Sequence, residues 1–252
     1  MSVPYQLEHS IIEAAAPVEV GHKTGQFWFP TLHQIGTSTL ICAVVRGDDT
    51  AQGQWPGELY VSEDAGLAWR EDLTIESYGH ASVRYDESTT LMMPYEFWPA
   101  SPGSKIDCIA PGTLLTKSSD GSLEAAARDV RFLGFPSLAP YHNDVLSLLH
   151  SGNLLHLKGE KWEALNLGAH HNECTEFEGH RFPDMFCSAE SDGNPAISTT
   201  YTGIMPWKSD GLIVTYDRLA NGWSSAPGPN GDFNRVFSVV LKISITDMES
   251  TP

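Results

Sequence analysis

The chain has 252 residues, 41% of them hydrophobic, and a formal net charge of −17 at pH 7. Chains of this length and composition can bury a core and often form one domain, so we expect a single domain over residues 1–252. A strongly negative field repels nucleic acids and anionic membrane surfaces, and we expect neither as a partner. No stretch approaches the roughly 20 apolar residues of a membrane-spanning helix.

The N-terminal sequence MSVPYQLEHS lacks the basic segment and the apolar run of a secretory signal, so we expect a cytoplasmic location unless the chain starts after a removed signal. The cysteines are too far apart for a zinc motif, and we interpret them as mostly buried thiols. We assign no cofactor and no metal ion. The cysteines are Cys42, Cys108, Cys174 and Cys187.

Taken in chain order, short apolar runs alternate with segments rich in Gly, Pro, Asn, Asp and Ser. The clearest runs are Thr39–Val45, Val145–Leu149, Leu212–Tyr216 and Phe237–Ile245. Helix signals are weak, and the longest candidate, Ser122–Arg128, is shorter than two helical turns. Short strands with turn signals between them predict an all-β sandwich, barrel or propeller.

A unit of strand, polar turn and strand repeats along the chain and narrows this choice. Successive units begin at Phe29, Gly79, Phe135 and Tyr201. The first three starts are about 50 residues apart, close to the period of propeller blades. We therefore predict a β-propeller of five blades, within a range of four to six.

Closure of such a ring gives a further expectation. A propeller joins its two chain ends because joining them removes open strand edges. We therefore expect the last apolar strand, Val236–Ile245, to pair near residues Leu7–Ala14.

The sharpest local signal is the sequence SEDAGLAW at residues 62–69, which follows the predicted strand Gly57–Val61. Asp64 can accept backbone N–H bonds in a tight turn, and Gly66 can supply a positive φ. Trp69 can bury its ring beneath the hairpin. The segment fits the pattern S-x-D-x-G-x-x-W and resembles the Asp-box of sialidases and their relatives.

Two other segments look like partial copies of this motif: Ser118–Ser122 keeps the Ser and the Asp, and Gly159–Trp162 keeps the Trp. The resemblance implies a sialidase-like β-propeller in which Asp-boxes lie at the blade periphery. It also implies that these motifs stabilise the blades and take no part in binding or catalysis.

The resemblance extends to several site positions. Sialidases open with a Phe-Arg-Ile-Pro strand, followed by an apolar strand that ends in an Arg and a loop with an acid/base Asp. This chain has FWFP at residues 27–30, then Arg46, then Asp48 and Asp49. Tyr201 starts a late strand at the position of the nucleophilic Tyr. The resemblance therefore implies Asp48 or Asp49 as acid/base, Tyr201 as nucleophile or acid, and Arg46 as a substrate clamp.

The chain departs from the sialidase pattern in the arginines that bind the carboxylate of the substrate. Trp28 stands where the first carboxylate-binding arginine of sialidases is found. Arg181 is a candidate for a further guanidinium, and Arg218 is another. Trp28 can stack on a sugar face or can belong to the core. For Arg46, the alternative to a clamp is an ion pair with Asp48 or Asp49.

Histidines form a second group of candidates, because the first strand of each propeller blade lines the central channel. His80 and His142 fall on such predicted strands, as do His33 and His180. One reading is an acid/base cluster or a metal site in the channel. The other is polar filler that is hydrogen-bonded to neighbouring strands.

The leading functional hypothesis is a carbohydrate-active enzyme that cleaves a glycosidic bond, by hydrolysis or by uronate elimination. In the elimination variant, His80 or His142 and Tyr201 would move protons. One alternative is a non-catalytic propeller that binds glycans or proteins, and another is a propeller recruited to non-glycan biosynthetic chemistry. We expect a small-molecule or oligosaccharide partner, and the oligomeric state stays open.

Overall fold

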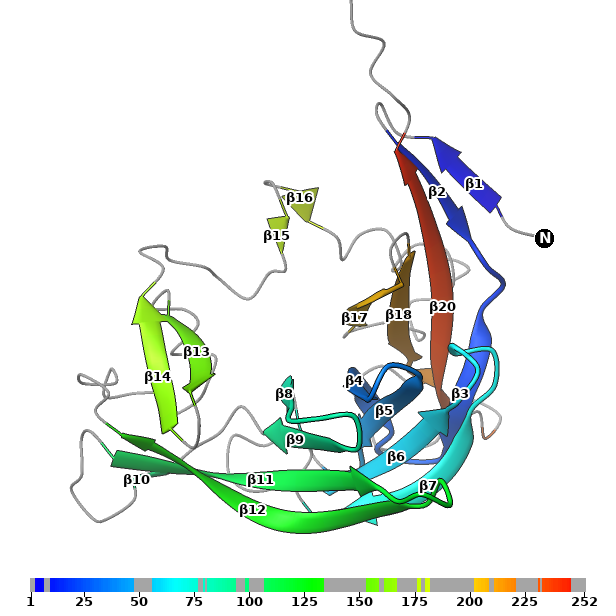
Figure 1. Cartoon of the computed structure of the whole chain (residues 1–252). Helices are drawn as coiled ribbons and strands as arrows, with labels where there is room; N and C mark the ends of the chain where they lie inside the picture. The colour runs from blue at the N-terminus through cyan, green and yellow to red at the C-terminus, as the bar shows by residue number, and fades with distance from the viewer. Residues whose placement is uncertain are drawn as a thin grey trace, which may run out of the picture.

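The structure is a computed structural model of the whole chain. It describes residues 3–6, 10–47, 56–76, 79, 81–93, 98–99, 107–133, 153–158, 161–166, 176–177, 180–181, 202–208, 211–220, 231 and 233–245. These residues form β-strands and turns with no α-helix, and nearly all strand pairs are antiparallel (Figure 1). The predicted all-β class is confirmed for the described residues. Within the described residues, no helix is long and apolar enough to cross a membrane.

The first sheet is an antiparallel meander of four consecutive strands. Its order is β4 (Trp28–Ile35), β5 (Thr39–Val45), β6 (Gly57–Ser62) and β7 (Arg70–Ile75). The predicted strand Thr39–Val45 is confirmed with its bounds. Every residue of β5 is buried, so both faces of this strand lie in packed surroundings.

The second sheet repeats this arrangement. Its meander is β8 (Ala81–Arg84), β9 (Thr89–Met93), β11 (Asp107–Lys117) and β12 (Leu123–Leu133). The helix candidate Ser122–Arg128 is therefore wrong, because most of it lies in β12. Residues from Leu123 onward pair in register with β11, and this tertiary pairing overrides their intrinsic preference for helix.

Shorter strands flank the second sheet. β10 (Trp98–Pro99) pairs with β11. The hairpin of β13 (Asn153–Lys158) and β14 (Lys161–Asn166) joins β12 through a single parallel pair. A separate pair consists of β15 (Glu176–Phe177) and β16 (His180–Arg181). The predicted strand Val145–Leu149 lies outside the described residues.

The third sheet combines the two ends of the chain. β17 (Thr202–Trp207), β18 (Gly211–Arg218) and β20 (Asn234–Ile245) form its C-terminal part. The N-terminal strands β2 (Ser10–Ala14) and β3 (Val18–Lys23) both pair with β20, and β1 (Val3–Gln6) pairs with β2. The strands predicted over Leu212–Tyr216 and Phe237–Ile245 are confirmed.

The predicted closure is also confirmed. The pairing of β2 with β20 runs from Ser10 opposite Ile245 to Ala14 opposite Leu241. The N-terminal strand therefore covers an edge of the C-terminal sheet that would otherwise be open.

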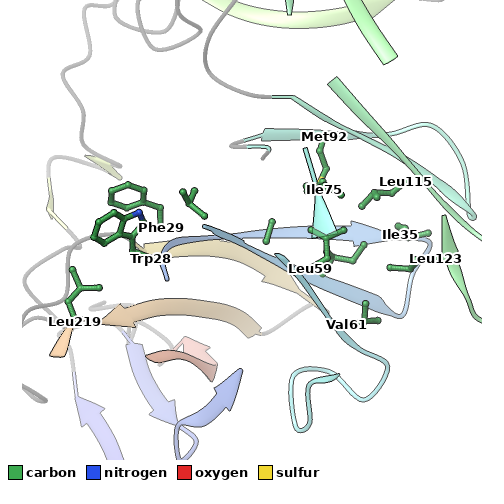
Figure 2. Close-up of a cluster of buried hydrophobic side chains, with 13 residues drawn as sticks. Trp28, Phe29, Ile35, Leu59, Val61, Ile75, Met92, Leu115, Leu123 and Leu219 are labelled. Atoms are coloured by element: carbon green, nitrogen blue, oxygen red, sulfur yellow. The ribbon is translucent and has the colours of Figure 1, made fainter. Parts of the chain in front are cut away.

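The hydrophobic core lies on both faces of the first sheet. Alternate side chains of β5 point to opposite faces. Ile41, Ala43 and Val45 belong to a cluster shared with Met92 and Leu115 of the second sheet. Figure 2 shows this cluster, in which Ile35, Leu59 and Val61 also lie with Leu115 and Leu123.

The other face of β5 packs on the third sheet. Cys42 and Val44 lie in a cluster with Val20 and Val236 of that sheet. Leu40 lies in a further cluster with Trp207, Ile213 and Val240. The first sheet is therefore packed between the second and the third sheet.

Candidate functional site

The Asp-box forms the turn between β6 and β7. The Ser62 hydroxyl donates to Asp64 Oδ1 at 2.8 Å, and the same oxygen accepts the Ala68 N–H at 2.9 Å. The Gly66 N–H donates to Ser62 Oγ at 2.8 Å, and Gly66 has a φ of +82°. The predicted roles of Asp64 and Gly66 are confirmed. The Ala68 amide is the main cause that holds the pKa of Asp64 below its usual range.

Trp69 links this hairpin to the third sheet. Its ring is partly buried and packs against two of the clusters around the first sheet. The indole Nε1 donates to Ser238 Oγ of β20 at 2.8 Å. Packing and a hydrogen bond therefore both join the Asp-box hairpin to the third sheet.

The partial copy at Ser118–Ser122 lies in the corresponding hairpin of the second sheet, between its third and fourth strands. Asp120 Oδ1 accepts the Ser122 N–H at 3.0 Å and the Ser122 hydroxyl at 2.7 Å. Gly121 has a φ of +87° and donates its N–H to Ser118 O at 2.9 Å. The two meanders thus share a turn of similar chemistry at the same place.

The start of β4 carries the first of the candidate site residues. Trp28 is 3% exposed and belongs to the cluster shared with the second sheet. Its indole Nε1 donates to Gly47 O at 3.2 Å. In this arrangement the ring presents almost no surface on which a sugar face could stack.

Arg46 follows directly after β5 and is held by several groups. Its Nε lies 3.2 Å from Glu58 Oε1, and its guanidinium also donates to the Gln26 carbonyl. The guanidinium carbon lies 5.8 Å from the centre of the Phe27 ring, within cation–π range. The ion-pair partner found in the structure is therefore Glu58. This pairing arises because Val44, two residues before Arg46, lies opposite Glu58 in the β5–β6 register.

Glu58 is the centre of a small polar cluster that the sequence reading missed. Glu58 Oε2 accepts the Tyr60 hydroxyl at 3.1 Å and lies 3.6 Å from Lys23 Nζ, which also pairs with Glu71 at 2.9 Å. The spacing of Glu58 and Tyr60 could have indicated their contact, because two residues that are two positions apart in a strand point to the same face.

A tyrosine beside a glutamate can serve as an activated nucleophile, but the surroundings of Tyr60 oppose this use. Burial, followed by the neighbouring Glu58, raises the pKa of the Tyr60 phenol far above its usual range. A Cβ atom at Gly21 would lie 2.6 Å from the Tyr60 ring, so the ring fills the space left by this glycine. The phenol therefore acts as a neutral hydrogen-bond donor that anchors Glu58.

The strand β4 begins at a strained backbone position. Phe29 has a φ of 54°, in the left-handed region that large side chains rarely adopt. Its N–H donates at 3.1 Å to Oδ2 of Asp217, a fully buried carboxylate at the end of β18. The β4–β5 register is irregular between Trp28 and Thr31. Such strain is retained where surrounding contacts enforce it, often near functional sites.

Hydrogen bonds from side chains also fix the loop before β4. Asn234 accepts the Ala220 N–H and donates to the Gly25 carbonyl, both at 2.8 Å. Arg46 holds the next carbonyl, that of Gln26. Residues 25–29 are thus tied to β18, β20 and the end of β5 at one place, which we call the β4 entrance.

Two of the candidate site residues, Trp28 and Arg46, meet at the β4 entrance. Asp48, Asp49, His80, His142 and Tyr201 lie outside the described residues. Arg181 is in β16, and its side chain is also outside the described part. The described residue next to Asp48 in the sequence is Gly47, whose carbonyl accepts from Trp28. The described residue next to Tyr201 is Thr202, which lies opposite Tyr216 in the β17–β18 register.

The surroundings of His33 fit the interpretation of this histidine as polar filler. It is 1% exposed, and its Nε2 lies 2.9 Å from Thr31 Oγ1, which donates to Gly79 O at 2.8 Å. Burial lowers the pKa of His33 to about 4, so the ring is neutral at neutral pH. Its Nδ1 has no hydrogen-bond partner among the described residues.

Within the described residues, no group of three or more His, Cys, Asp or Glu side chains is arranged to hold a metal ion. Searches of protein-family models, of curated proteins and of solved structures find no significant match to this chain.

Proposed function

We propose that the chain is a sialidase-like β-propeller that acts on carbohydrate, with its site at the β4 entrance. The observation that carries the proposal is the formed Asp-box, with Asp64 and Ser62 closing the turn and Trp69 joining the hairpin to the neighbouring sheet. A turn of related chemistry at Asp120 supports the same reading.

The arrangement of the sheets gives further support to a propeller. β4, the first strand of the first sheet, contacts β17 and β18 of the third sheet and β8 and β9 of the second. The approach of β17 to β4 is close, since a Cβ atom at Gly203 would lie 3.1 Å from Leu32 N and 3.2 Å from Pro30 O. A propeller with a central channel requires the first strands of its blades to lie side by side. The five-blade count additionally requires blades between β12 and β17, where β13–β14 is the first described hairpin.

A fold alone does not specify a reaction, so the chemistry in this proposal rests on the candidate site residues that the sequence predicts. The proposed reaction is cleavage of a glycosidic bond. Tyr201 acts as nucleophile or acid, and Asp48 or Asp49 acts as acid/base. Arg46 and Arg181 bind the substrate. In a uronate-elimination variant, His80 or His142 moves the proton together with Tyr201.

The test is turnover on a panel of sialosides, uronic-acid-capped oligosaccharides and neutral oligosaccharides, followed by new reducing ends or unsaturated uronates. Tyr201→Phe removes only the hydroxyl and should lower the rate by at least about 10²-fold. Tyr85→Phe, at a tyrosine that is 41% exposed, is the matched control and should leave the rate unchanged. Turnover that survives Tyr201→Phe would remove this residue from the mechanism.

A second candidate function is a propeller that binds glycans or proteins without catalysis. The specific observation in its favour is that Arg46 is held by Glu58 and Gln26, while the Trp28 ring is buried. In this case the panel shows binding without product, and Tyr201→Phe costs at most one hydrogen bond, about 0.5–1.5 kcal/mol of affinity. Neither binding nor turnover on any glycan would instead favour a propeller recruited to non-glycan chemistry.

A further inference from the structure

In the part of the chain that the structure describes, the outer edge of β12 is unpaired over most of its length. One edge of the strand pairs with β11 from Leu123 to Leu133. On the other edge, the only described pair is Phe132 with Trp162 of β14. β7 lies near β12 but belongs to a different sheet and shares no hydrogen-bonded pair with it. In Figure 1, β12 follows the outer side of β11 along the rim of the molecule.

The hairpin geometry shows which backbone groups point outward from this edge. The Ser118 N–H donates to Ser122 O at 2.9 Å, so the backbone of Ser122 faces β11. Hydrogen-bonding direction alternates along an antiparallel strand. The even-numbered residues of β12 therefore bond to β11. The odd-numbered ones, including Ala125 and Ala127, direct their N–H and C=O groups toward the open edge.

The side chains along this edge do little to block a new strand. Residues 124–129 are all exposed, three of them are alanines, and none is a proline. Proline, bulges and inward-pointing charges are common ways to protect an edge from pairing. Glu124 and Arg128 have no ion-pair partner among the described residues. They lie on the same face of the strand but about 13 Å apart, too far to pair with each other.

We infer that this edge pairs with the same edge of a second copy of the chain, in an antiparallel, two-fold arrangement centred on Ala126. In this register Ala125 of one copy lies opposite Ala127 of the other, and their outward N–H and C=O groups bond to each other. Glu124 lies opposite Arg128 of the second copy, twice by symmetry. Opposite charges at directly opposed positions stabilise a strand pair.

Other two-fold registers lack one of these features. A centre between two residues would set outward-facing groups opposite inward-facing ones and break the hydrogen-bond pattern. A centre at Ala125 places Glu124 opposite Ala126, and a centre at Ala127 places it opposite Val130. The register centred on Ala126 matches both the backbone groups and the charges. Since the contact is small and each copy carries a net charge of −17, we expect a weak, concentration-dependent dimer.

The experiment is sedimentation velocity of the full chain over a concentration series, with the Glu124→Arg and Arg128→Glu variants. The wild type should shift toward dimer as concentration rises. Each single variant places like charges opposite each other and should stay monomeric. An equimolar mixture of the two variants pairs Arg with Glu at both positions, so it should recover the dimer, as should the double variant E124R/R128E.

Two further variants separate the interface from the fold. Ala125→Pro removes an outward N–H without removing a bond to β11, so it should abolish the dimer and leave the melting temperature unchanged. Glu87→Arg makes the same charge change as Glu124→Arg at an exposed turn between β8 and β9 and should leave the dimer intact. A wild-type chain that stays monomeric at every concentration would overturn the inference. A dimer that survives Glu124→Arg, or a variant mixture that fails to associate, would also overturn it.

Discussion

The indole of Trp69 and the hydroxyl of Ser238 are 169 residues apart in the sequence and form a hydrogen bond of 2.8 Å. Ser238 Oγ in turn donates to Gly66 O at 3.3 Å. One hydroxyl of β20 therefore contacts both the side chain and the backbone of the Asp-box hairpin. The turn chemistry of the first sheet is coupled through it to the third sheet, which holds both ends of the chain.

This coupling predicts the effect of changing Trp69. Trp69→Ala should lower the free energy of unfolding by about 3 kcal/mol, because it removes a ring packed between two sheets. Trp69→Phe and Ser238→Ala should each cost about 1 kcal/mol, and a double-mutant cycle should give a coupling of about 0.5–1.5 kcal/mol. Urea unfolding measures all of these values. Leu67→Ala, at a side chain that is 65% exposed, should change little, and a coupling of zero would contradict the role of this hydrogen bond.

The Asp64 carboxylate predicts an acid-dependent loss of stability. The pKa of Asp64 is held below its ordinary value of 3.8, chiefly by the Ala68 N–H and also by Ser62. Its stabilising contribution is therefore full above the unfolded-state pKa and is lost as the pH falls through the lower folded-state pKa. Asp64→Asn should remove this part of the pH dependence, while Asp129→Asn, at an exposed position, should not. The check is urea unfolding at pH 7 and at several values below pH 4.

The buried His33 predicts a second pH effect at higher pH. Its pKa falls from 6.5 to about 4 because burial opposes the charged ring. The contribution of the neutral ring is full above about pH 6.5 and declines as the pH falls toward 4, by about 3 kcal/mol in total. His33→Gln should flatten the stability profile in this window. An unchanged profile in His33→Gln would show that another group titrates.

The N-terminal strand predicts the behaviour of the closed sheet. Ile12 of β2 is 8% exposed and packs with Val239 and Leu241, so Ile12→Ala should cost about 2–4 kcal/mol. Ile245, its matched control at the end of β20, is 83% exposed and should tolerate alanine. Deletion of residues 1–14 should lower the melting temperature and promote aggregation, because it opens an edge of β20. A deleted chain with the parent melting temperature would contradict the role of this pairing.

Much of the local structure could be predicted from the sequence where local and tertiary preferences agree. β5 is a run of β-branched and apolar residues and has the predicted bounds, and the Asp-box turn is encoded by Asp64 and Gly66. β12 could not be predicted in this way, because LEAAAR consists of good helix formers. Its strand conformation depends on the turn at Asp120 and on pairing with β11.

The candidate site was less accessible to sequence reasoning, because its contacts depend on register. Arg46 meets Glu58 only because β5 and β6 pair with Val45 opposite Gly57. Phe29 and Asp217 are 188 residues apart, and no local pattern links them. A buried Trp28 and a Tyr60 anchored on Glu58 likewise follow from the packing of the first sheet on its neighbours.

The central claim is that a glycan binds at the β4 entrance and away from the Asp-box turns. Hydrogen–deuterium exchange with and without the best glycan of the panel tests it directly. The account predicts slower exchange in peptides that cover residues 25–33 and 44–50, and unchanged exchange in peptides that cover residues 62–69 and 118–122. Protection of either turn with no change at residues 25–33, or no protection anywhere at saturating glycan, would contradict the account.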